Sequence, residues 1–294
     1  MIKVNHLKKR YGKEIVLKDL SFEVRKGDIF SLLGPNGAGK TTTLECMEGL
    51  RNFDGGEILI DGLRPKEALK KGLTGVQLQS SSLPAAITVK DAMKLFCTWK
   101  KIEYRGDLME GLGLEELSNK KYKTLSTGQK RRLHLALALS HSPEVLFLDE
   151  PTAGLDVEAR ANLHKEIRRL KEEGTTIVLA SHDMAEVEAL SDQVGMIVKG
   201  ELRQLGSPGE IVGNIEKEEW LEVCWRGTIE DFPEEFLFQW EKNKEAYRCR
   251  TFDKINGIRE ILDFTESRSY ELLDLKIVKP SLEERFLELS KGGI

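Results

Sequence analysis

The sequence predicts an α/β fold: a mainly parallel sheet with an antiparallel β subdomain, an inserted helical subdomain and a small C-terminal α/β domain. Three observations lead to this prediction. The apolar run Ile29–Leu33 precedes a Gly-x-x-x-x-Gly-Lys-Thr pattern and a helix, which together form a strand–loop–helix unit. Strands and helices alternate again over residues 144–200, as in a parallel sheet covered by helices. Residues 88–140 have helical spacing and indicate an insertion.

The first sixty residues have the pattern of strands joined by tight turns. Lys26-Gly27-Asp28 and Asp54-Gly55-Gly56 supply residues that favour turns. The expected strands are Ile2–Leu7, Leu17–Val24, Ile29–Leu33 and Glu57–Ile60, and the expected helix is Lys40–Gly49.

Three helices are expected next, at Val89–Lys100, Arg105–Leu114 and Ser126–Ser140. In the first of them, Met93, Leu95, Phe96 and Trp99 are expected to pack against other helices. The second alternating stretch comprises Val145–Leu148, Val157–Lys171, Thr176–Ala180, Met184–Leu190 and Val194–Val198.

The chain changes composition after Gly206-Ser-Pro-Gly209 and Gly213-Asn214, where it becomes rich in Glu, Trp and Phe. We therefore expect one domain at 1–214, with its helical subdomain at about 80–143, and an accessory α/β domain at 215–294 with about one strand per helix. Its expected elements are the strands Trp220–Trp225 and Tyr270–Ile277 and the helices Ile255–Thr265 and Leu282–Leu289.

Residues 34–41 read Gly-Pro-Asn-Gly-Ala-Gly-Lys-Thr, the pattern of a phosphate-binding loop. Its glycines let backbone N–H groups surround a triphosphate at a helix N-terminus. Lys40 adds a positive charge near the β- and γ-phosphates, and the Thr41 hydroxyl is suited to Mg²⁺. The alternative is a glycine-rich surface turn. By itself the loop does not distinguish a kinase, a GTPase and a transport ATPase.

Two further patterns extend the chemistry. The expected apolar strand Val145–Leu148 is followed by the acidic pair Asp149-Glu150. Asp149 could hold Mg²⁺ and Glu150 could act as general base on water, although solvated acids often follow a strand. Ser126 and Gln129 form a capping box that could present Ser126 and the Gly128 amide to a γ-phosphate, or merely begin a helix.

With these residues the chain resembles the ATP-binding subunit of an ABC transporter. The segment Leu125-Ser-Thr-Gly-Gln129 is similar to the Leu-Ser-Gly-Gly-Gln signature of that family, and it precedes the strand with the acidic pair. Ala153-Gly-Leu-Asp156 resembles the D-loop, and Ala180-Ser-His-Asp183 contains the switch histidine, His182. The signature and the D-loop argue against a small-molecule kinase.

Two more segments complete the resemblance, which covers residues 1–212 with six motifs in family order. Lys9-Arg-Tyr-Gly-Lys13 supplies the adenine-stacking aromatic, Tyr11, and Gly75-Val-Gln-Leu-Gln79 resembles the glutamine loop, with the functional residue expected at Gln79 rather than Gln77. The resemblance implies a P-loop NTPase fold and hydrolysis of ATP with Mg²⁺.

The resemblance also implies a set of site residues. The implied nucleotide-binding residues are Tyr11, Gly34, Pro35, Asn36, Gly37, Ala38, Gly39, Lys40, Thr41 and Thr42. The implied catalytic residues are Glu150, His182 and Gln79, and the implied Mg²⁺ ligands are Thr41, Gln79 and Asp149. The residues expected to complete the ATP site of a partner subunit are Leu125, Ser126, Thr127, Gly128, Gln129 and, from the D-loop, Asp156.

The sequence departs from the family pattern at two positions. Thr127 stands where the first signature glycine is usual, and Ala153 replaces a common D-loop serine. Neither substitution removes a catalytic group. We therefore expect a competent ATPase in which closure of the dimer is altered or hydrolysis is slower.

The implied partners are a separate membrane permease and a second ATPase subunit, identical or different, because one chain has one phosphate loop and one signature. Gly75–Val89 and Lys279–Leu289 resemble the drug and antibiotic exporter branch. We therefore expect an exporter subunit for drugs, antibiotics or other amphiphiles, with an accessory domain that aids dimerisation or regulation. Two alternatives are a soluble ABC ATPase of translation or DNA repair, and a mechanotransmission complex that moves no solute.

Net charge, apolar segments and the placement of cysteine and histidine argue against several other classes of protein. The net charge is −4, which gives no footprint for nucleic acid. The N-terminus lacks the apolar region of a secretory signal, and no apolar run approaches the ~20 residues that span a bilayer. The four cysteines and five histidines are scattered, so we expect neither disulfides nor a metal cluster. The expected location is the cytoplasm, at the inner face of the membrane through the permease.

Overall fold

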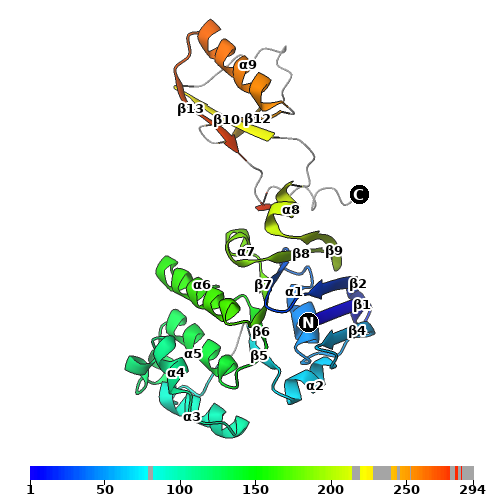
Figure 1. Cartoon of the computed structure of the whole chain (residues 1–294), viewed down its shortest axis with the longest axis vertical. Coiled ribbons are helices and arrows are strands. Elements are labelled where there is room, and N and C mark those ends of the chain that lie inside the picture. The colour runs from blue at the N-terminus through cyan, green and yellow to red at the C-terminus, as the bar shows by residue number, and fades with distance from the viewer. Residues whose placement is uncertain are drawn as a thin grey trace. The chain divides into compact units, whose positions relative to one another are not determined.

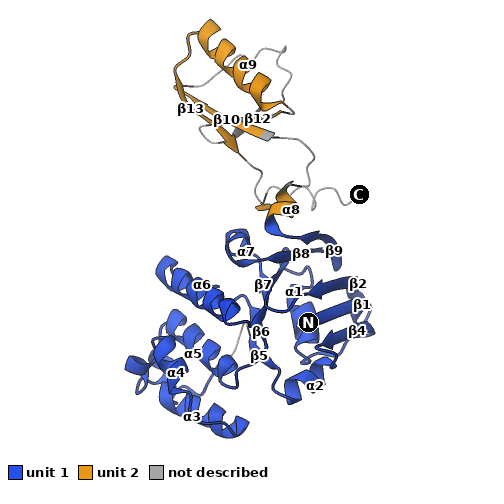
Figure 2. Ribbon diagram, viewed as in Figure 1, with its two compact units in different colours: residues 1–208 blue, residues 209–294 orange. Residues whose placement is uncertain are grey.

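The computed structural model of the chain describes residues 1–78, 82–213, 219–227, 240–243, 246–251, 253–278, 282–283 and 286. The chain divides into two compact units, unit 1 (Met1–Pro208) and unit 2 (Gly209–Ile294) (Figure 2). The domain assignment at 1–214 and 215–294 stays a prediction.

Unit 1 contains a three-stranded antiparallel sheet in the order β2-β1-β4 (Figure 1). Its strands are β1 (Ile2–Tyr11), β2 (Glu14–Val24) and β4 (Gly55–Ile60). β1 and β2 form one hairpin whose turn lies between Tyr11 and Glu14, so both strands are longer than the sequence predicts. Tyr11 is thereby placed at the tip of this hairpin.

The second sheet of unit 1 has the order β5-β6-β7-β3-β8-β9. The first five strands are parallel, and β9 is antiparallel to β8. Every residue of β3, β6 and β7 is buried, as expected for central strands of a parallel sheet with both faces covered. The strands are β3 (Ile29–Leu33), β5 (Thr74–Gln77), β6 (Val145–Asp149), β7 (Thr176–Ser181), β8 (Gln193–Val198) and β9 (Glu201–Gly206).

The two faces of this sheet belong to different hydrophobic clusters. In β6, Val145 and Phe147 join the cluster that includes β1, β2 and α1, whereas Leu146 and Leu148 join the cluster formed with the helical subdomain and α6. This alternation follows from the two-residue period of a strand. The sheet therefore fixes the antiparallel strands on one side and the inserted helices on the other.

The helices confirm the predicted α/β class. Those around the central sheet are α1 (Lys40–Met47), α2 (Pro65–Lys70), α6 (Val157–Glu172) and α7 (Met184–Leu190), and α8 (Pro208–Gly213) follows at the junction of the units. The inserted helices are α3 (Val89–Lys100), α4 (Gly106–Gly111), two 3-10 turns (Glu115–Leu117 and Tyr122–Thr124) and α5 (Thr127–Leu139). Within the described residues, no helix is long and apolar enough to cross a bilayer.

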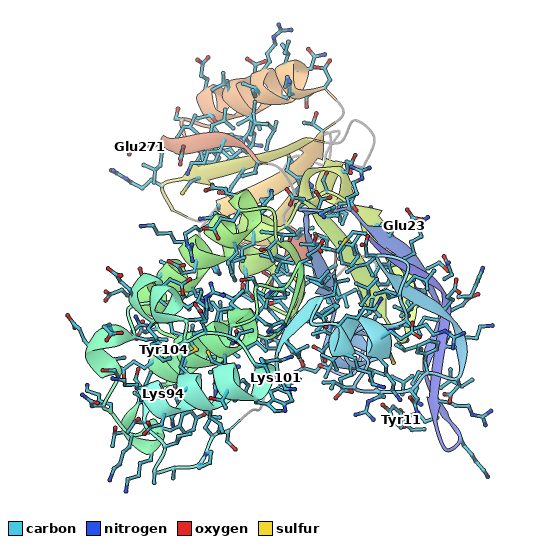
Figure 3. The ribbon with its side chains drawn as sticks, turned by 60° about the horizontal axis from the view of Figure 1, so that its bottom comes forward. Tyr11, Glu23, Lys94, Lys101, Tyr104 and Glu271 are labelled. Atoms are coloured by element: carbon cyan, nitrogen blue, oxygen red, sulfur yellow. The ribbon has the colours of Figure 1, made fainter. Side chains whose placement is uncertain are left out.

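Helix α3 corrects one sequence expectation. Met93 is fully buried and Phe96 packs against the core, but the side chain of Leu95 is 55% exposed and that of Trp99 is 70% exposed. The helical spacing identified the helix correctly. It could not show that the face with Leu95 and Trp99 is left uncovered by the described elements. Figure 3 places the neighbouring Lys94 and Lys101 with the helical subdomain, and Tyr11 on the other side of unit 1.

Unit 2 has a four-stranded antiparallel sheet in the order β11-β12-β10-β13 and one long helix, α9 (Lys254–Ser267). Its strands are β10 (Glu219–Trp225), β11 (Trp240–Asn243), β12 (Ala246–Thr251) and β13 (Leu272–Val278). The described part of unit 2 thus differs from the expected ratio of one strand per helix. The expected helix Leu282–Leu289 falls mostly outside the described residues.

The core of unit 2 lies between its sheet and α9. Its apolar residues are Leu221, Val223, Trp225, Tyr247, Cys249, Ile261 and Phe264. The indole Nε1 of Trp225 donates a hydrogen bond to Thr265 Oγ1 at 2.9 Å, which satisfies its buried N–H group. This helix therefore packs on the sheet through an aromatic core with its own internal polar contact.

Candidate nucleotide-binding site

The three chemical motifs of the sequence meet at the carboxyl ends of neighbouring strands. In the sheet, β7 lies between β6 and β3, and all three are parallel. Gly34 follows β3, Glu150 follows β6, and His182 follows β7. Residues more than a hundred positions apart are thus brought to one edge, the usual place for ligands in parallel α/β sheets.

The loop between β3 and α1 can be formed only by glycine at two positions. A Cβ atom on Gly34 would lie 2.2 Å from the carbonyl oxygen of Ile197, and one on Gly39 would lie 2.6 Å from Leu17 Cδ2. Gly39 also has φ +107° and precedes the first residue of α1. By contrast, a Cβ on Gly37 would meet nothing within 4 Å, so the loop is open on that side.

Lys40 is buried at the start of α1, with its ammonium turned toward the loop. Nζ donates hydrogen bonds to the carbonyl oxygens of Gly34 at 2.7 Å and Pro35 at 3.2 Å. Burial lowers the pKa of Lys40, while the charges of Glu150 and Asp149 oppose that shift. An anion beside the ammonium would offset this desolvation, which fits a bound triphosphate.

Thr41 and Asp149 provide oxygen ligands for a hard cation. The Thr41 hydroxyl donates to Asp149 Oδ1 at 3.4 Å, across the space between α1 and β6. Burial is the largest cause that raises the pKa of Asp149 to about 6, and the Glu150 charge adds to the effect. A buried carboxylate beside a hydroxyl is a donor set that Mg²⁺ accepts. Elsewhere in the described residues, no cluster of His, Cys, Asp and Glu could hold a metal ion.

Glu150 and His182 lie in direct contact. His182 Nδ1 is 2.7 Å from Glu150 Oε2, and the Glu150 carboxylate is almost buried whereas the imidazole is half exposed. Glu150 has φ +48°, and its backbone N–H donates to the Ala180 carbonyl at 2.9 Å. The backbone at the end of β6 thus turns the carboxylate toward the residue that follows β7.

A buried network holds the segment that carries His182, and sequence reasoning missed it. Ser181 Oγ donates to Glu186 Oε2 at 2.6 Å and accepts from the Asp183 N–H at 3.0 Å. Arg160 of α6 forms an ion pair with Asp183 at 2.8 Å. The sequence signal was weak: Glu186 is an ordinary polar residue in a helical pattern, and only the fold shows that it is buried.

Tyr11 lies at the hairpin tip with its ring 41% exposed. Lys9 Nζ and Arg51 Cζ are each 5.3 Å from the ring centroid, and Arg51 is held by Glu45 of α1. The ring therefore has an exposed surface for stacking and a cationic surrounding. Val16 of the same hairpin, which the sequence analysis did not select, approaches the position of Gly39.

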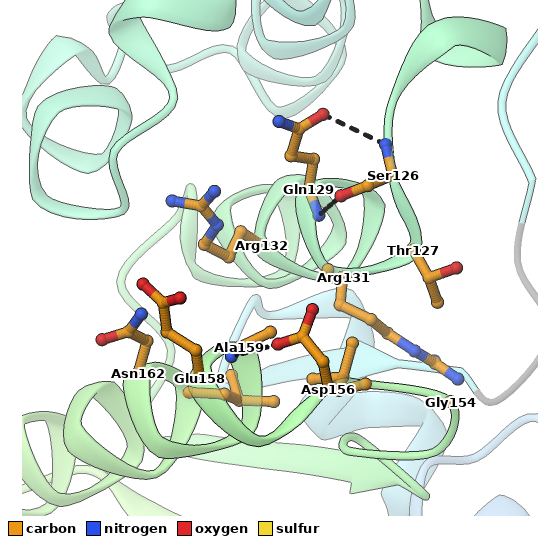
Figure 4. A pocket seen from close by; sticks show the side chains of 13 residues that line it. Ser126, Thr127, Gln129, Arg131, Arg132, Gly154, Asp156, Glu158, Ala159 and Asn162 are labelled. Carbon is orange, nitrogen blue, oxygen red and sulfur yellow. Dashed lines mark hydrogen bonds between the residues drawn. The ribbon is translucent and has the colours of Figure 1, made fainter.

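The signature segment forms a separate pocket with the D-loop (Figure 4). Ser126 caps α5: its Oγ accepts from the Gln129 N–H at 3.2 Å, and the Gln129 side chain accepts from the Ser126 N–H at 3.0 Å. Because Oγ only accepts in this box, its own hydrogen is free to donate to an anion. Asp156 lies across the pocket and caps α6 through the Ala159 N–H at 2.8 Å.

Of the two departures from the family pattern, Thr127 lines this pocket, and Ala153 precedes Gly154, which also lines it. The Thr127 methyl group would be 3.9 Å from a Cβ atom on Gly154, so the signature and the D-loop nearly touch. A Cβ on Gly128 would lie 3.2 Å from the Cβ of Ala159, which leaves room for little more than glycine there. Thr127 is exposed and Ala153 is partly exposed, so neither disturbs the fold of this chain.

Gln79, a predicted catalytic residue and Mg²⁺ ligand, lies outside the described residues. Gln77 ends β5 and is buried, and its side-chain amide has no hydrogen-bond partner among the described residues. Arg131 of α5 approaches the Leu78 carbonyl at 3.5 Å, so the helix after the signature reaches the segment that leads to Gln79. The choice between Gln79 and Gln77 stays a prediction.

Comparison with known proteins decides the family. A family model described as ABC transporter matches residues 17–153. The linearmycin resistance ATP-binding protein LnrL of Bacillus subtilis (strain 168) is 30% identical over 99% of this chain and 98% of its own length. The chain belongs to the ABC transporter ATP-binding family.

Two further matches cover about the cassette alone. The spermidine/putrescine import ATP-binding protein PotA of Mycoplasma mycoides subsp. mycoides SC is 36% identical over 72% of this chain and 62% of its own length. A dimeric ATP-binding cassette solved in a post-hydrolysis state with ADP and Pi is 25% identical, with a TM-score of 0.63 over 70% of this chain and 98% of that one. These matches confirm the predicted fold.

This ABC subunit is an ATPase that uses ATP and Mg²⁺, and it works with a membrane permease and a second ATPase subunit. The geometry agrees with that activity: a phosphate loop and an acidic pair lie at one sheet edge, and the signature lies in a different pocket with the D-loop. A second cassette can therefore supply the signature that the first site lacks.

Proposed function

We propose that this ABC subunit energises export of antibiotics or other amphiphiles and lies on the inner face of the cell membrane through its permease. The observation that supports export is the extent of similarity to LnrL, which includes unit 2 as well as the cassette. PotA, whose name describes an import protein, aligns with this chain over about the length of the cassette. Because cassettes serve both directions, unit 2 is the part of the chain that favours export.

In the proposed cycle, ATP lies along the phosphate loop with its adenine on Tyr11 and its phosphates near Lys40. Thr41, Asp149 and Gln79 would hold Mg²⁺, which would neutralise charge on the phosphates. Glu150 orients and deprotonates the attacking water, and His182 contacts the γ-phosphate. The observed contact at 2.7 Å joins His182 Nδ1 to one carboxylate oxygen of Glu150, Oε2, and Oε1 of the same carboxylate is the oxygen proposed to accept the proton of the water.

The second subunit completes the site. Ser126 and the Gly128 N–H of one chain contact the γ-phosphate held by Lys40 of the other, and Asp156 lies beside them. ATP binds the closed pair better than the open pair, and hydrolysis removes that difference. Thr127 adds a methyl group at this surface, so closure is expected to be slower than with glycine at this position.

The exposed face of α3 is the proposed contact with the permease. Leu95 and Trp99 are more than half exposed, and both lie on the first helix of the inserted subdomain. Apolar side chains of this size on one helix face favour a protein partner over solvent. This assignment replaces the expectation that both residues pack internally.

Transport by inside-out vesicles tests the proposal. Vesicles that contain the membrane protein co-purifying with this chain should accumulate an amphiphilic antibiotic when Mg-ATP is supplied outside. The Glu150→Gln variant is the matched control, because it keeps the assembly and removes the base. ATP hydrolysis without accumulation, or release of preloaded solute from the vesicles, would contradict export while leaving the ATPase assignment intact.

A further inference from the structure

Strand β13 is an end strand of the unit 2 sheet, and among described strands only β10 pairs with it (Figure 1). The N–H and C=O groups on the outer side of an edge strand can pair with another strand. Proteins usually protect such edges with proline, bulges or charged side chains, lysine above all. β13 contains no proline, and its bulge lies near its first residues, between the Cys224–Asp274 and Trp225–Leu272 pairs. Its two charged residues, Asp274 and Lys276, have opposite signs, so they can pair with a second strand as well as protect the edge.

The edge also carries exposed apolar side chains. Leu273 is 51% exposed and Ile277 is 52% exposed, whereas Leu275 between them is partly buried against the core. The other edge strand, β11, has four residues, compared with seven in β13. The longer edge thus offers both backbone groups and apolar surface to a partner.

The sequence of β13 is complementary to itself in one antiparallel register. With Leu275 opposite Leu275 of a second copy, Asp274 lies opposite Lys276 of that copy, and Leu273 lies opposite its Ile277. Opposite charges on facing residues stabilise antiparallel strands, and like charges destabilise them. In the isolated chain Asp274 and Lys276 pair with each other on the same face of the strand.

Neighbouring registers are unfavourable. A shift that centres the pairing on residue 274 places two aspartates opposite each other, and one centred on residue 276 places two lysines opposite each other. A shift by a single residue would bring side chains of opposite faces together. The alternation of apolar and charged residues from 273 to 277 thus selects one register for a copy of the same strand.

We propose that β13 pairs antiparallel with β13 of a second copy of this chain and joins the two unit 2 sheets across a two-fold axis. A two-fold interface uses the same patch on both subunits, which is what the register of this strand provides. The proposal rests on the proposed function in taking a second ATPase subunit as partner, and it adds that this subunit is an identical chain.

Crosslinking of the full chain tests the pairing. Leu275→Cys places one thiol opposite its own copy, and a short bismaleimide should join the two without nucleotide and in the Glu150→Gln background with ATP. The unmodified chain, in which Cys46, Cys97 and Cys249 are buried and Cys224 of β10 is partly buried, is the control for native thiols. The expected product is a covalent dimer that the control does not form.

Charge reversal gives the decisive comparison. Asp274→Lys or Lys276→Asp, each in the Leu275→Cys chain, changes two attractive pairs into two repulsive ones and should lower the crosslinked fraction about tenfold. An equimolar mixture of the two variants, distinguished by tags of different size, should recover a mixed dimer, because every facing pair is then of opposite charge. Misfolding of either variant could not produce this recovery.

Two results would overturn the proposal: no crosslink in either nucleotide condition, or a crosslink that charge reversal does not change. Failure of the proposed ATPase cycle is recognised separately. If Glu150→Gln with ATP stays monomeric by light scattering but the charge-dependent crosslink persists, the cassette pairing fails and the β13 pairing stands. If the ATP-locked dimer forms without the crosslink, the reverse holds.

Discussion

The two units of this chain bury different kinds of side chain. Unit 1 buries the charged residues Lys40, Glu48, Asp149, Glu150 and Glu186. Unit 2, in its described residues, buries the polar side chains of Thr251 and Thr265 alone, with an otherwise apolar core. Burial of a charge is costly unless it is paired, so a fold that keeps several of them does so for a purpose other than stability.

The two units also differ in where their charged residues lie. Lys40, Asp149 and Glu150 lie where β3 and β6 end, and burial is the chief cause of the pKa shifts of Lys40 and Asp149. In the described part of unit 2 the charged residues are partly or largely exposed, as in the Glu222–Arg248 pair and the Asp274–Lys276 pair. Unit 1 thus has the features of a catalytic site, and unit 2 those of a structural or docking element.

Loss of the base should have the largest effect. Glu150→Gln is expected to lower the ATP hydrolysis rate about 100- to 10,000-fold while nucleotide binding persists, because only proton abstraction is removed. Glu222→Gln, which removes an acid of unit 2, is the matched control and should leave the rate unchanged. Steady-state hydrolysis and equilibrium binding of labelled ATP measure the two effects. A Glu150→Gln variant that kept most of its rate would place the base elsewhere.

Truncation of a core aromatic residue in each unit should separate their stabilities. Trp225→Ala is expected to destabilise unit 2 by about 3–5 kcal/mol and to leave ATP binding by unit 1 within about twofold. Phe147→Ala in β6 removes a fully buried ring of unit 1 and should weaken ATP binding as well as stability. For both variants, calorimetry measures the change in stability and titration with ATP measures the change in binding. If Trp225→Ala abolished ATP binding, the two units would not be energetically separate.

A buried acid should make the stability of unit 1 depend on pH. Burial, with the nearby Asp149 and Glu45 charges, raises the pKa of Glu48 to about 8. In the unfolded chain this carboxyl group ionises near its ordinary pKa of 4.5. Between pH 4.5 and about 8 the unfolded state therefore binds fewer protons than the folded state, and the free energy of unfolding falls as pH rises through this range. Glu48→Gln should therefore stabilise the protein by about 2–4 kcal/mol at pH 8.

Denaturant unfolding at pH 5 and pH 8 measures this difference. The gain from Glu48→Gln should be largest at pH 8 and small at pH 5, where the native carboxyl is already neutral in the folded state. Glu222→Gln, at a partly exposed ion pair of unit 2, should show no such gain at alkaline pH. A gain equal at both pH values would mean that Glu48 acts through packing and not through its charge.

Matched helix caps should give the smallest effect and the clearest contrast. Asp156 caps α6 through the Ala159 N–H, and Asp253 caps α9 through the N–H groups of Ile255 and Asn256. Substitution of either by Ala should cost about 1 kcal/mol of stability. Only Asp156→Ala should also lower ATP hydrolysis, because Asp156 lines the signature pocket. If the two variants hydrolysed ATP at equal rates, Asp156 would act only as a structural helix cap.

Sequence reasoning worked best where a local pattern has a local cause. The phosphate loop, the strand ending in Asp149-Glu150 and the Ser126–Gln129 capping box depend on neighbouring residues, and the structure contains each of them in the expected context. It worked less well for α3, where the exposure of Leu95 and Trp99 depends on which elements cover the helix. It also missed β11, which has four residues, and β12, whose short alternation of Tyr247 and Cys249 with arginines was overlooked.

The sequence by itself determined the fold class, the order of the motifs and the reaction, because glycine, lysine and acidic residues at fixed spacing have few other physical uses. Tertiary structure alone decided which residues meet. The contact of Glu150 with His182 and the ion pair of Arg160 with Asp183 join positions that the chain separates, and the order of the described strands places β13 at an edge of its sheet. Strand order in a sheet sets these contacts, and periodicity along the chain carries no record of strand order.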